Sequence, residues 1–114
     1  MTNIEENVSL KDFNTFGLEA KARQFYRFSN VDELQEVLKN KADHTDLLIL
    51  GGGSNLLFTK DFEGLVLKNE LKGIEVIKDD NQSVWVKAQA GENWHEFVTH
   101  CIKEGWAGIE NLSL

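Results

Sequence analysis

Three consecutive glycines, Gly51, Gly52 and Gly53, followed by Ser54 and Asn55, form the stretch of this sequence with the clearest potential for chemistry. Glycine has no Cβ, so such a run can adopt positive φ and bring its backbone close to another group. Successive peptide N–H groups in a loop of this kind form a concave anion site, for which phosphate is a natural ligand. The alternative is a tight turn without a ligand, and glycine turns far outnumber phosphate-binding loops. The pattern alone leaves both interpretations open.

The better-known glycine motifs do not fit this loop. A dinucleotide fingerprint that begins at Gly51 and Gly53 would place Leu56 where a third small residue is needed. A Walker loop requires Gly-Lys-Ser or Gly-Lys-Thr, and neither follows. A nucleophile elbow requires glycine on both sides of Ser54, but Leu56 occupies the second position. The sequence therefore argues against nucleotide hydrolysis and against Ser54 as a nucleophile.

The elements before the loop are predicted to place it at the end of a strand. The apolar run at residues 47–50 is typical of a fully buried strand, and residues 25–28 predict an earlier strand. Between them, Ser29 and Asp32 have the spacing of a capping box for a helix that ends near Asn40. We expect a strand-helix-strand unit with a parallel strand pair and a right-handed crossover. Ligands usually bind at the carboxyl ends of such strands.

The second half of the chain predicts further strands at residues 64–67, 74–77 and 84–88, with a hairpin turn at residues 79–82. A final amphipathic helix is expected, with Asn93 as its cap and Gly105 at its end. Its apolar face comprises Trp94, Phe97, Val98, Cys101 and Ile102. The predicted fold class is α+β, with a β-α-β lobe over residues 1–68 and the start of a mixed-sheet lobe with a helix over residues 69–114.

The other reactive side chains are weaker candidates for a site. Cys101 lies on the apolar face of the final helix and is predicted to be a packed core thiol, and Trp94 is also expected in the core. His100 has no second ligand at helical spacing, so no metal site is predicted. His95 follows the start of the helix and could touch a ligand, whereas His44 lies in a polar loop.

Composition limits the classes of partner. The chain has 114 residues, 41% of them hydrophobic, and a formal net charge of −7, so nucleic acid and phospholipid surfaces would be repelled on average. A single cysteine forms no internal disulfide, and no apolar run approaches the length of a membrane span, which predicts a cytoplasmic protein. Proline is absent and residues 111–114 are largely apolar, so we expect the natural chain to continue beyond residue 114.

Four segments together resemble the UDP-N-acetylenolpyruvoylglucosamine reductases, a bacterial family of peptidoglycan-precursor enzymes. They are Asn-Thr-Phe-Gly at residues 14–17, Ile-Leu-Gly-Gly-Gly-Ser-Asn-Leu-Leu at 49–57, Ala-Gly-Glu-Asn-Trp-His at 90–95 and Gly-Ile-Glu-Asn-Leu at 108–112. The resemblance covers essentially the whole chain. It implies a flavin-binding fold of the vanillyl-alcohol-oxidase (PCMH) type, of which residues 1–114 would form a part.

The resemblance also implies a cofactor and the residues that hold it. In this family the glycine-serine-asparagine loop surrounds the diphosphate of FAD, with peptide N–H groups as donors. Carried over to this sequence, the implied cofactor-binding residues are Leu50, Gly51, Gly52, Gly53, Ser54, Asn55 and Leu56. Such a loop needs no lysine or arginine to hold a phosphate, which suits an acidic protein.

The activity implied for the parent protein is that of an NADPH- and FAD-dependent oxidoreductase. The family reduces the enolpyruvyl group of a UDP-sugar substrate to give UDP-N-acetylmuramate, and the flavin carries the chemistry. The family's catalytic residues lie in segments beyond residue 114, so we expect no catalytic residue and no reductase activity in this chain alone. The alternative is a small non-enzymatic binding module that shares the fold and self-associates through Leu112, Leu114 and its sheet edges.

Overall fold

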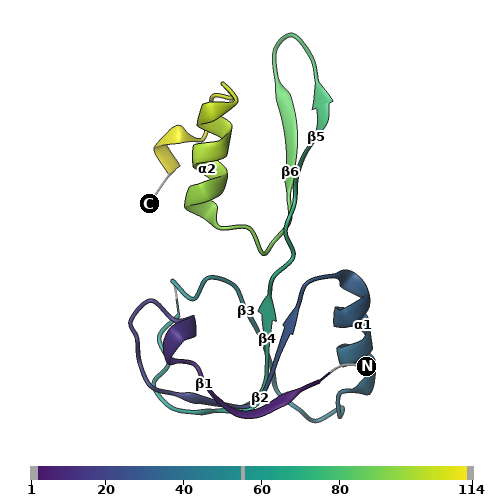
Figure 1. The fold of residues 1–114 in the computed structure, drawn as a ribbon, viewed down its shortest axis with the longest axis vertical. Helices are drawn as coiled ribbons and strands as arrows, with labels where there is room; N and C mark the ends of the chain where they lie inside the picture. The colour runs from purple at the N-terminus through teal and green to yellow at the C-terminus, as the bar shows by residue number, and fades with distance from the viewer. Residues whose placement is uncertain (1–2, 55, 113–114) are drawn as a thin grey trace. The chain divides into compact units, whose positions relative to one another are not determined.

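The computed structural model describes residues 3–54 and 56–112, which form two compact units, Met1–Glu70 and Leu71–Leu114 (Figure 1). The first unit contains the glycine loop and a four-stranded sheet, and the second contains a two-stranded hairpin and a helix. The sequence analysis placed this division between residues 68 and 69. Each unit is described separately.

The sheet of the first unit has the strand order β1-β2-β4-β3. Its strands are β1 (Glu5–Ser9), β2 (Lys21–Phe28), β3 (Leu47–Leu50) and β4 (Phe62–Asn69). Strand β4 is parallel to both β2 and β3, and β1 is antiparallel to β2. Strands β2 and β3 therefore run parallel, as expected, but their expected direct pairing is wrong, because β4 lies between them. Four consecutive buried residues, 64–67, explain this central position, since a central strand is covered on both faces.

Strand β3 is not fully buried, contrary to the prediction from its four apolar residues. Leu50 is inaccessible to solvent, but Leu47 is 39% exposed and Ile49 is 55% exposed. The sequence signal failed because β3 lies at the edge of the sheet, where one side of the strand has no neighbouring strand. Burial of its residues therefore alternates with the period of a strand.

The two faces of this sheet carry different elements. Phe25 of β2 packs against Phe13 of the short 3₁₀ helix η1 (Lys11–Phe13), with ring centroids 4.9 Å apart. The next residue, Tyr26, donates a hydrogen bond from its hydroxyl to Glu33 of helix α1 (Val31–Asn40). Because successive strand residues point to opposite faces, η1 and α1 lie on opposite sides of the sheet (Figure 1).

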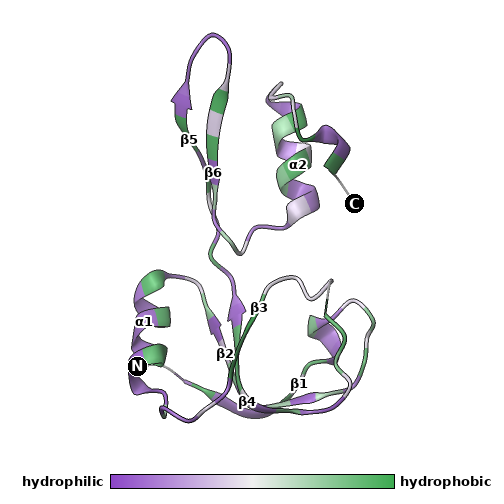
Figure 2. Ribbon diagram, turned by 180° about the vertical axis from the view of Figure 1, so that it is seen from behind, coloured by the Kyte–Doolittle hydropathy of each residue, from purple (hydrophilic) through white to green (hydrophobic). Residues whose placement is uncertain are grey.

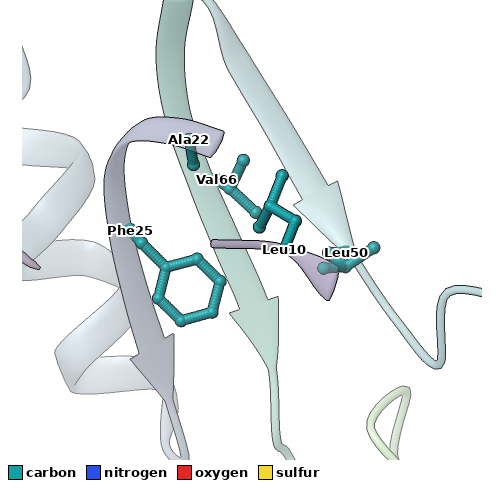
Figure 3. Packing of buried hydrophobic residues seen from close by; sticks show 5 residues of the cluster. All are labelled: Leu10, Ala22, Phe25, Leu50 and Val66. Atoms are coloured by element: carbon teal, nitrogen blue, oxygen red, sulfur yellow. The ribbon is translucent and has the colours of Figure 1, made fainter. Parts of the chain in front are cut away.

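A compact apolar cluster fills the η1 face of the sheet (Figure 3). Its buried members come from β2, β3, β4 and the residue before η1, and they are Leu10, Ala22, Phe25, Leu50 and Val66. Half-buried Leu56 and Phe58, which follow the glycine loop, pack against it. The loop is thus attached to the core at both of its ends, through Leu50 and Leu56.

The N-terminal cap of helix α1 lies one residue later than the sequence analysis placed it. The predicted box of Ser29 and Asp32 is wrong: Asn30 Oδ1 accepts from the Glu33 N–H at 2.9 Å, and Asn30 Nδ2 donates to the Glu33 carboxylate at 2.8 Å. The same spacing of three residues occurs in both registers, and asparagine is the stronger cap in this case because its amide also reaches the glutamate.

In the second unit, β5 (Ile74–Asp79) and β6 (Val84–Ala88) form the predicted antiparallel hairpin. Asp80 Oδ1 accepts from the Gln82 and Ser83 N–H groups, both at 2.8 Å, which fixes the turn. Hydrophobic and hydrophilic residues alternate along β6, as expected for a strand with one covered face (Figure 2).

Helix α2 (Trp94–Lys103) has both predicted ends. Asn93 Oδ1 accepts from the Glu96 N–H at 2.9 Å. At the other end, Gly105 has φ +77°, its N–H donates to the Ile102 carbonyl at 3.1 Å, and Trp106 N–H donates to the Cys101 carbonyl at 2.9 Å. These two bonds form a Schellman motif, which favours glycine at this position. Short helix η2 (Glu110–Leu112) follows.

We predict that Asn30→Ala lowers the free energy of unfolding of the first unit by about 1 kcal/mol, because the first turn of α1 loses its cap. Urea unfolding followed by circular dichroism measures this. Ser29→Ala is the matched control and should cost less than about half as much, because the Ser29 hydroxyl reaches only the exposed Glu33 carboxylate. A larger loss for Ser29→Ala would contradict the assigned cap.

We also predict that Glu33 makes the first unit sensitive to acid. The Tyr26 hydroxyl, followed by the Ser29 N–H, lowers the pKa of this carboxyl below its usual 4.5. Its stabilising contribution is therefore complete above pH 4.5 and is lost as the pH falls through the lowered folded-state value. In urea titrations between neutral and acidic pH, Glu33→Gln should lose less stability than the wild type. Parallel stability profiles for the two proteins would refute the prediction.

Candidate functional site

The glycine loop begins where strand β3 ends. The carboxyl ends of β2 and β4 lie at the same end of the sheet. These three strands are parallel, so their carboxyl ends share one edge of the sheet (Figure 1). The described part of the loop comprises residues 51–54 and 56, and Asn55 lies outside the described residues. The sequence-predicted loop is thus located where open parallel sheets bind ligands.

Gly53 fixes the path of the loop. It is buried with φ +75°, and a Cβ at this position would clash with the carbonyl oxygen of Phe13 and lie 2.9 Å from the Cα of Asn14. The Gly53 carbonyl accepts a hydrogen bond from the Thr15 N–H at 3.1 Å. Only glycine combines this conformation with this approach. The role of Gly53 is therefore structural.

Asn14 holds the segment against which Gly53 packs. Its side-chain amide is buried and donates to the carbonyls of Leu10 at 2.8 Å and Leu18 at 3.1 Å, while its Oδ1 accepts from the Leu18 N–H at 3.0 Å. These bonds fold residues 10–18 into a rigid turn. The Asn-Thr-Phe-Gly segment and the glycine loop, which are far apart in the sequence, therefore form one local structure.

Gly51 and Gly52 present bare backbone to solvent. Both residues are exposed, and a Cβ on either of them would have no neighbouring atom within 4 Å. Within residues 3–54 and 56–112, no protein acceptor receives a hydrogen bond from the N–H groups of Gly52, Gly53 or Ser54. A run of peptide N–H groups without acceptors, beside exposed glycines, is suited to binding an anion.

The flanking members of the predicted site contribute through their backbone alone. The side chain of Leu50 is fully buried in the core cluster, and Leu56 packs against that cluster. The side chain of Ser54 is exposed. The structure thus brings residues 50–54 and 56 together as one loop, with apolar anchors at its ends and polar backbone between them.

The sequence analysis missed two cations near the carboxyl ends of β2 and β4, one of which contacts the loop. Lys68 Nζ donates to the Gly51 carbonyl at 2.6 Å. Arg27 is the β2 register partner of Lys68 on β4, and its guanidinium lies 4.8 Å from the ring centroid of Phe13. No local motif links these residues to the glycines, because they come from separate strands. The one sequence feature that could have indicated them is their position near the carboxyl ends of two predicted strands.

The other sequence candidates do not converge on a site. Cys101 is buried, which raises the pKa of its thiol, and its prediction as a packed core thiol is confirmed. Trp94 is 45% exposed, so its expected core position is wrong; its indole N–H donates to the Leu112 carbonyl instead. The ring of His100 packs edge-on against Trp106, and the side chain of His95 is exposed.

His44 is exposed on a loop of the first unit. Among the described residues, no group of three or more His, Cys, Asp or Glu side chains is arranged to hold a metal ion. The described residues also include no helix that is both long and apolar enough to span a membrane. The glycine loop, together with Lys68 and Arg27 near the carboxyl ends of β4 and β2, therefore remains the candidate site.

Comparisons with known proteins identify relatives of this chain. The sequence pattern of a family described as an FAD-binding domain matches residues 22–114. Among curated relatives, UDP-N-acetylenolpyruvoylglucosamine reductase of Flavobacterium johnsoniae is 51% identical over 111 residues, and that of Pseudomonas fluorescens is 49% identical over 113. These alignments cover 97% and 98% of this chain, but the chain spans only 33% of the length of each relative.

A solved structure has the same fold. The crystal structure of UDP-N-acetylenolpyruvylglucosamine reductase (MurB) from Thermus caldophilus superposes with a TM-score of 0.70 and 22% sequence identity, covering 98% of this chain and 38% of that one. At this identity the likeness establishes the fold alone. The expected α+β flavin-binding fold is confirmed.

We predict that Gly53→Ala lowers the free energy of unfolding by about 2 kcal/mol or more, because a Cβ is strained at positive φ and clashes with Phe13. Gly52→Ala is the matched control and should change it by less than about 1 kcal/mol, since its Cβ would meet open space. Urea unfolding of both variants tests this. Equal losses would show that Gly53 is not the residue that fixes the loop.

Proposed function

Because the chain belongs to the FAD-binding domain family, we propose that it binds FAD and holds the diphosphate of that cofactor on residues 50–56. The observation that carries this proposal is the exposed backbone of Gly51 and Gly52 at the carboxyl end of β3, next to peptide N–H groups that have no protein acceptor among the described residues. Peptide dipoles of this kind stabilise phosphate oxygens without a dedicated charged side chain.

The donor set suits a diphosphate. The N–H groups of Gly52, Gly53 and Ser54 follow one another along the loop, so they can serve neighbouring oxygens. The absence of a side chain at Gly51 and Gly52 lets a phosphate approach the backbone closely. Gly53 and Asn14 hold the loop in place before the ligand arrives, so less conformational freedom is lost on binding.

We further propose that this chain forms the flavin-binding part of an NADPH- and FAD-dependent reductase. The substrate would be UDP-N-acetylglucosamine enolpyruvate, and the product a precursor of bacterial peptidoglycan made in the cytoplasm. Support comes from relatives that carry the reductase name, of which the chain spans about a third of the length. Bound FAD would supply hydride transfer, while residues 50–56 bind and orient its diphosphate. We assign no catalytic side chain to this part of the protein.

A non-enzymatic, self-associating module is the second candidate. The observation in its favour is exposed apolar surface along the edge strand, at Leu47 and Ile49, together with Leu57 after the glycine loop. Exposed edges of this type favour association. Leu112, which the sequence analysis expected to contribute, is 56% exposed, whereas Leu114 lies outside the described residues.

We predict that Gly52→Asp weakens FAD binding at least tenfold, which corresponds to about 1.4 kcal/mol, because it places a carboxylate beside the diphosphate. Titration of FAD fluorescence with the 114-residue chain measures the affinity. Gly52→Ala is the control and should bind within about threefold of the wild type. Gly53→Asp is unsuitable because its Cβ disturbs the fold.

Two results would contradict the proposed cofactor role. Equal affinity of the wild type and Gly52→Asp would remove the diphosphate from this loop. A wild-type chain that forms dimers and binds no FAD at high micromolar concentration would favour the self-associating module instead.

A further inference from the structure

We propose that Lys68 is a positioning residue for the anion site, and that Lys68 and Arg27 together make the glycine loop selective for a diphosphate. This inference deepens the proposed function and rests on it for the identity of the ligand. Nothing in the glycine pattern itself points to either cation. The assignment follows from one hydrogen bond, two strand registers and one cation–π contact.

The hydrogen bond from Lys68 fixes the orientation of one peptide unit. Its ammonium holds the carbonyl oxygen of Gly51 at 2.6 Å. A trans peptide is planar, so the N–H group of Gly52 in the same unit must point away from that oxygen. Glycine backbone is otherwise free to rotate this unit. By holding the Gly51 carbonyl, Lys68 therefore directs the Gly52 N–H, the first donor of the loop, away from its own side chain.

Lys68 also brings a positive charge to the site. The Gly51 carbonyl accepts a hydrogen bond from the ammonium, and this contact also masks the negative end of that peptide dipole. Lys68 is the register partner of Leu50, the last residue before the loop. Its position on the central strand β4 therefore places the charge directly beside the start of the glycine run.

Arg27 supplies the second charge from the neighbouring strand. It is the register partner of Lys68, and both residues lie on the η1 face of the sheet, since Arg27 stacks over Phe13 of η1. The backbone of Phe13 in turn contacts Gly53. Lys68 thus contacts the glycine run at Gly51, and Arg27 lies over the ring of Phe13, the residue whose backbone Gly53 meets.

Two cations on neighbouring strands suit a ligand with two linked anionic groups better than one with a single phosphate. The protein has a net charge of −7, so an anion approaching it is repelled on average. Two local positive charges offset this repulsion at the loop. The ligand class is a diphosphate ester, such as the diphosphate of a flavin dinucleotide, and flavins that lack phosphate should gain nothing from these residues.

The deciding experiment titrates the 114-residue chain with inorganic pyrophosphate and follows the backbone amide resonances of Gly52, Gly53 and Ser54. The wild type should show saturable shifts at these amides. Lys68→Met should bind about tenfold more weakly, because the Gly51–Gly52 peptide loses its fixed orientation and the loop loses a nearby positive charge. Lys68→Arg should recover most of the affinity, and Arg27→Met should weaken binding to a smaller extent.

Lys39→Met is the matched control, because Lys39 is an exposed lysine on α1, on the opposite face of the sheet. It should titrate like the wild type. Added salt should weaken pyrophosphate binding more in the wild type than in Lys68→Met, which a purely structural role of Lys68 would not produce. Identical titrations for the wild type and Lys68→Met, or the absence of shifts at the loop in the wild type, would overturn the proposal.

A parallel titration with FAD and riboflavin separates this proposal from the proposed function. Lys68→Met should weaken FAD binding and leave riboflavin binding unchanged. If pyrophosphate binding depends on Lys68 but FAD does not bind, the cofactor assignment fails and the assignment of Lys68 stands. If FAD binds equally to the wild type and Lys68→Met, the cofactor assignment stands and that of Lys68 fails.

Discussion

The close contact between Gly53 and the Phe13–Asn14 backbone is the constraint on which the site depends. Without it, a run of three glycines would sample many conformations, and its N–H groups would not point in a common direction. The buried amide of Asn14 makes the contact possible, because it fixes residues 10–18 through three hydrogen bonds. The proposed anion site thus depends on a turn that precedes it by nearly forty residues in the sequence.

The glycines of the loop have different physical roles despite their identical side chains. Gly53 is required by its conformation and by its close neighbour, whereas Gly51 and Gly52 leave open space that a ligand can occupy. This distinction explains why a substitution at one position tests stability and a substitution at the next tests binding. In the proposed function, peptide dipoles held in place by packing carry the recognition of phosphate in a protein with a large negative charge.

Much of the fold follows from local sequence signals. The ends of α2 were predictable because Asn93 and Gly105 each perform a local task, and the β5–β6 turn because Asp80 bonds its own neighbours. The order of strands was not predictable in this way, since the insertion of β4 between β2 and β3 depends on pairing across the whole unit. The partial exposure of β3 has the same origin, because an edge position is a property of the sheet.

The candidate site also combines residues that local sequence predicts with residues that only the strand register brings together. The glycine run itself predicted an anion-binding loop within residues 50–56, and the resemblance to a known family indicated FAD as its ligand. Lys68 and Arg27 were not visible, because each is an ordinary strand residue until the register of β2, β4 and β3 brings them to one edge. The exposure of Trp94 was not predictable from the helical pattern either. Its indole N–H donates to the backbone of η2, a contact between separate segments, instead of packing inward.

The central claim is that the peptide N–H groups of this loop hold a diphosphate. An experimental structure of the chain with FAD tests it most directly. We predict diphosphate oxygens about 3 Å from the peptide nitrogens of Gly52 and Ser54, with the flavin ring away from the glycines. FAD bound elsewhere, or bound with its adenine or flavin ring against the loop and its diphosphate in solvent, would contradict the account.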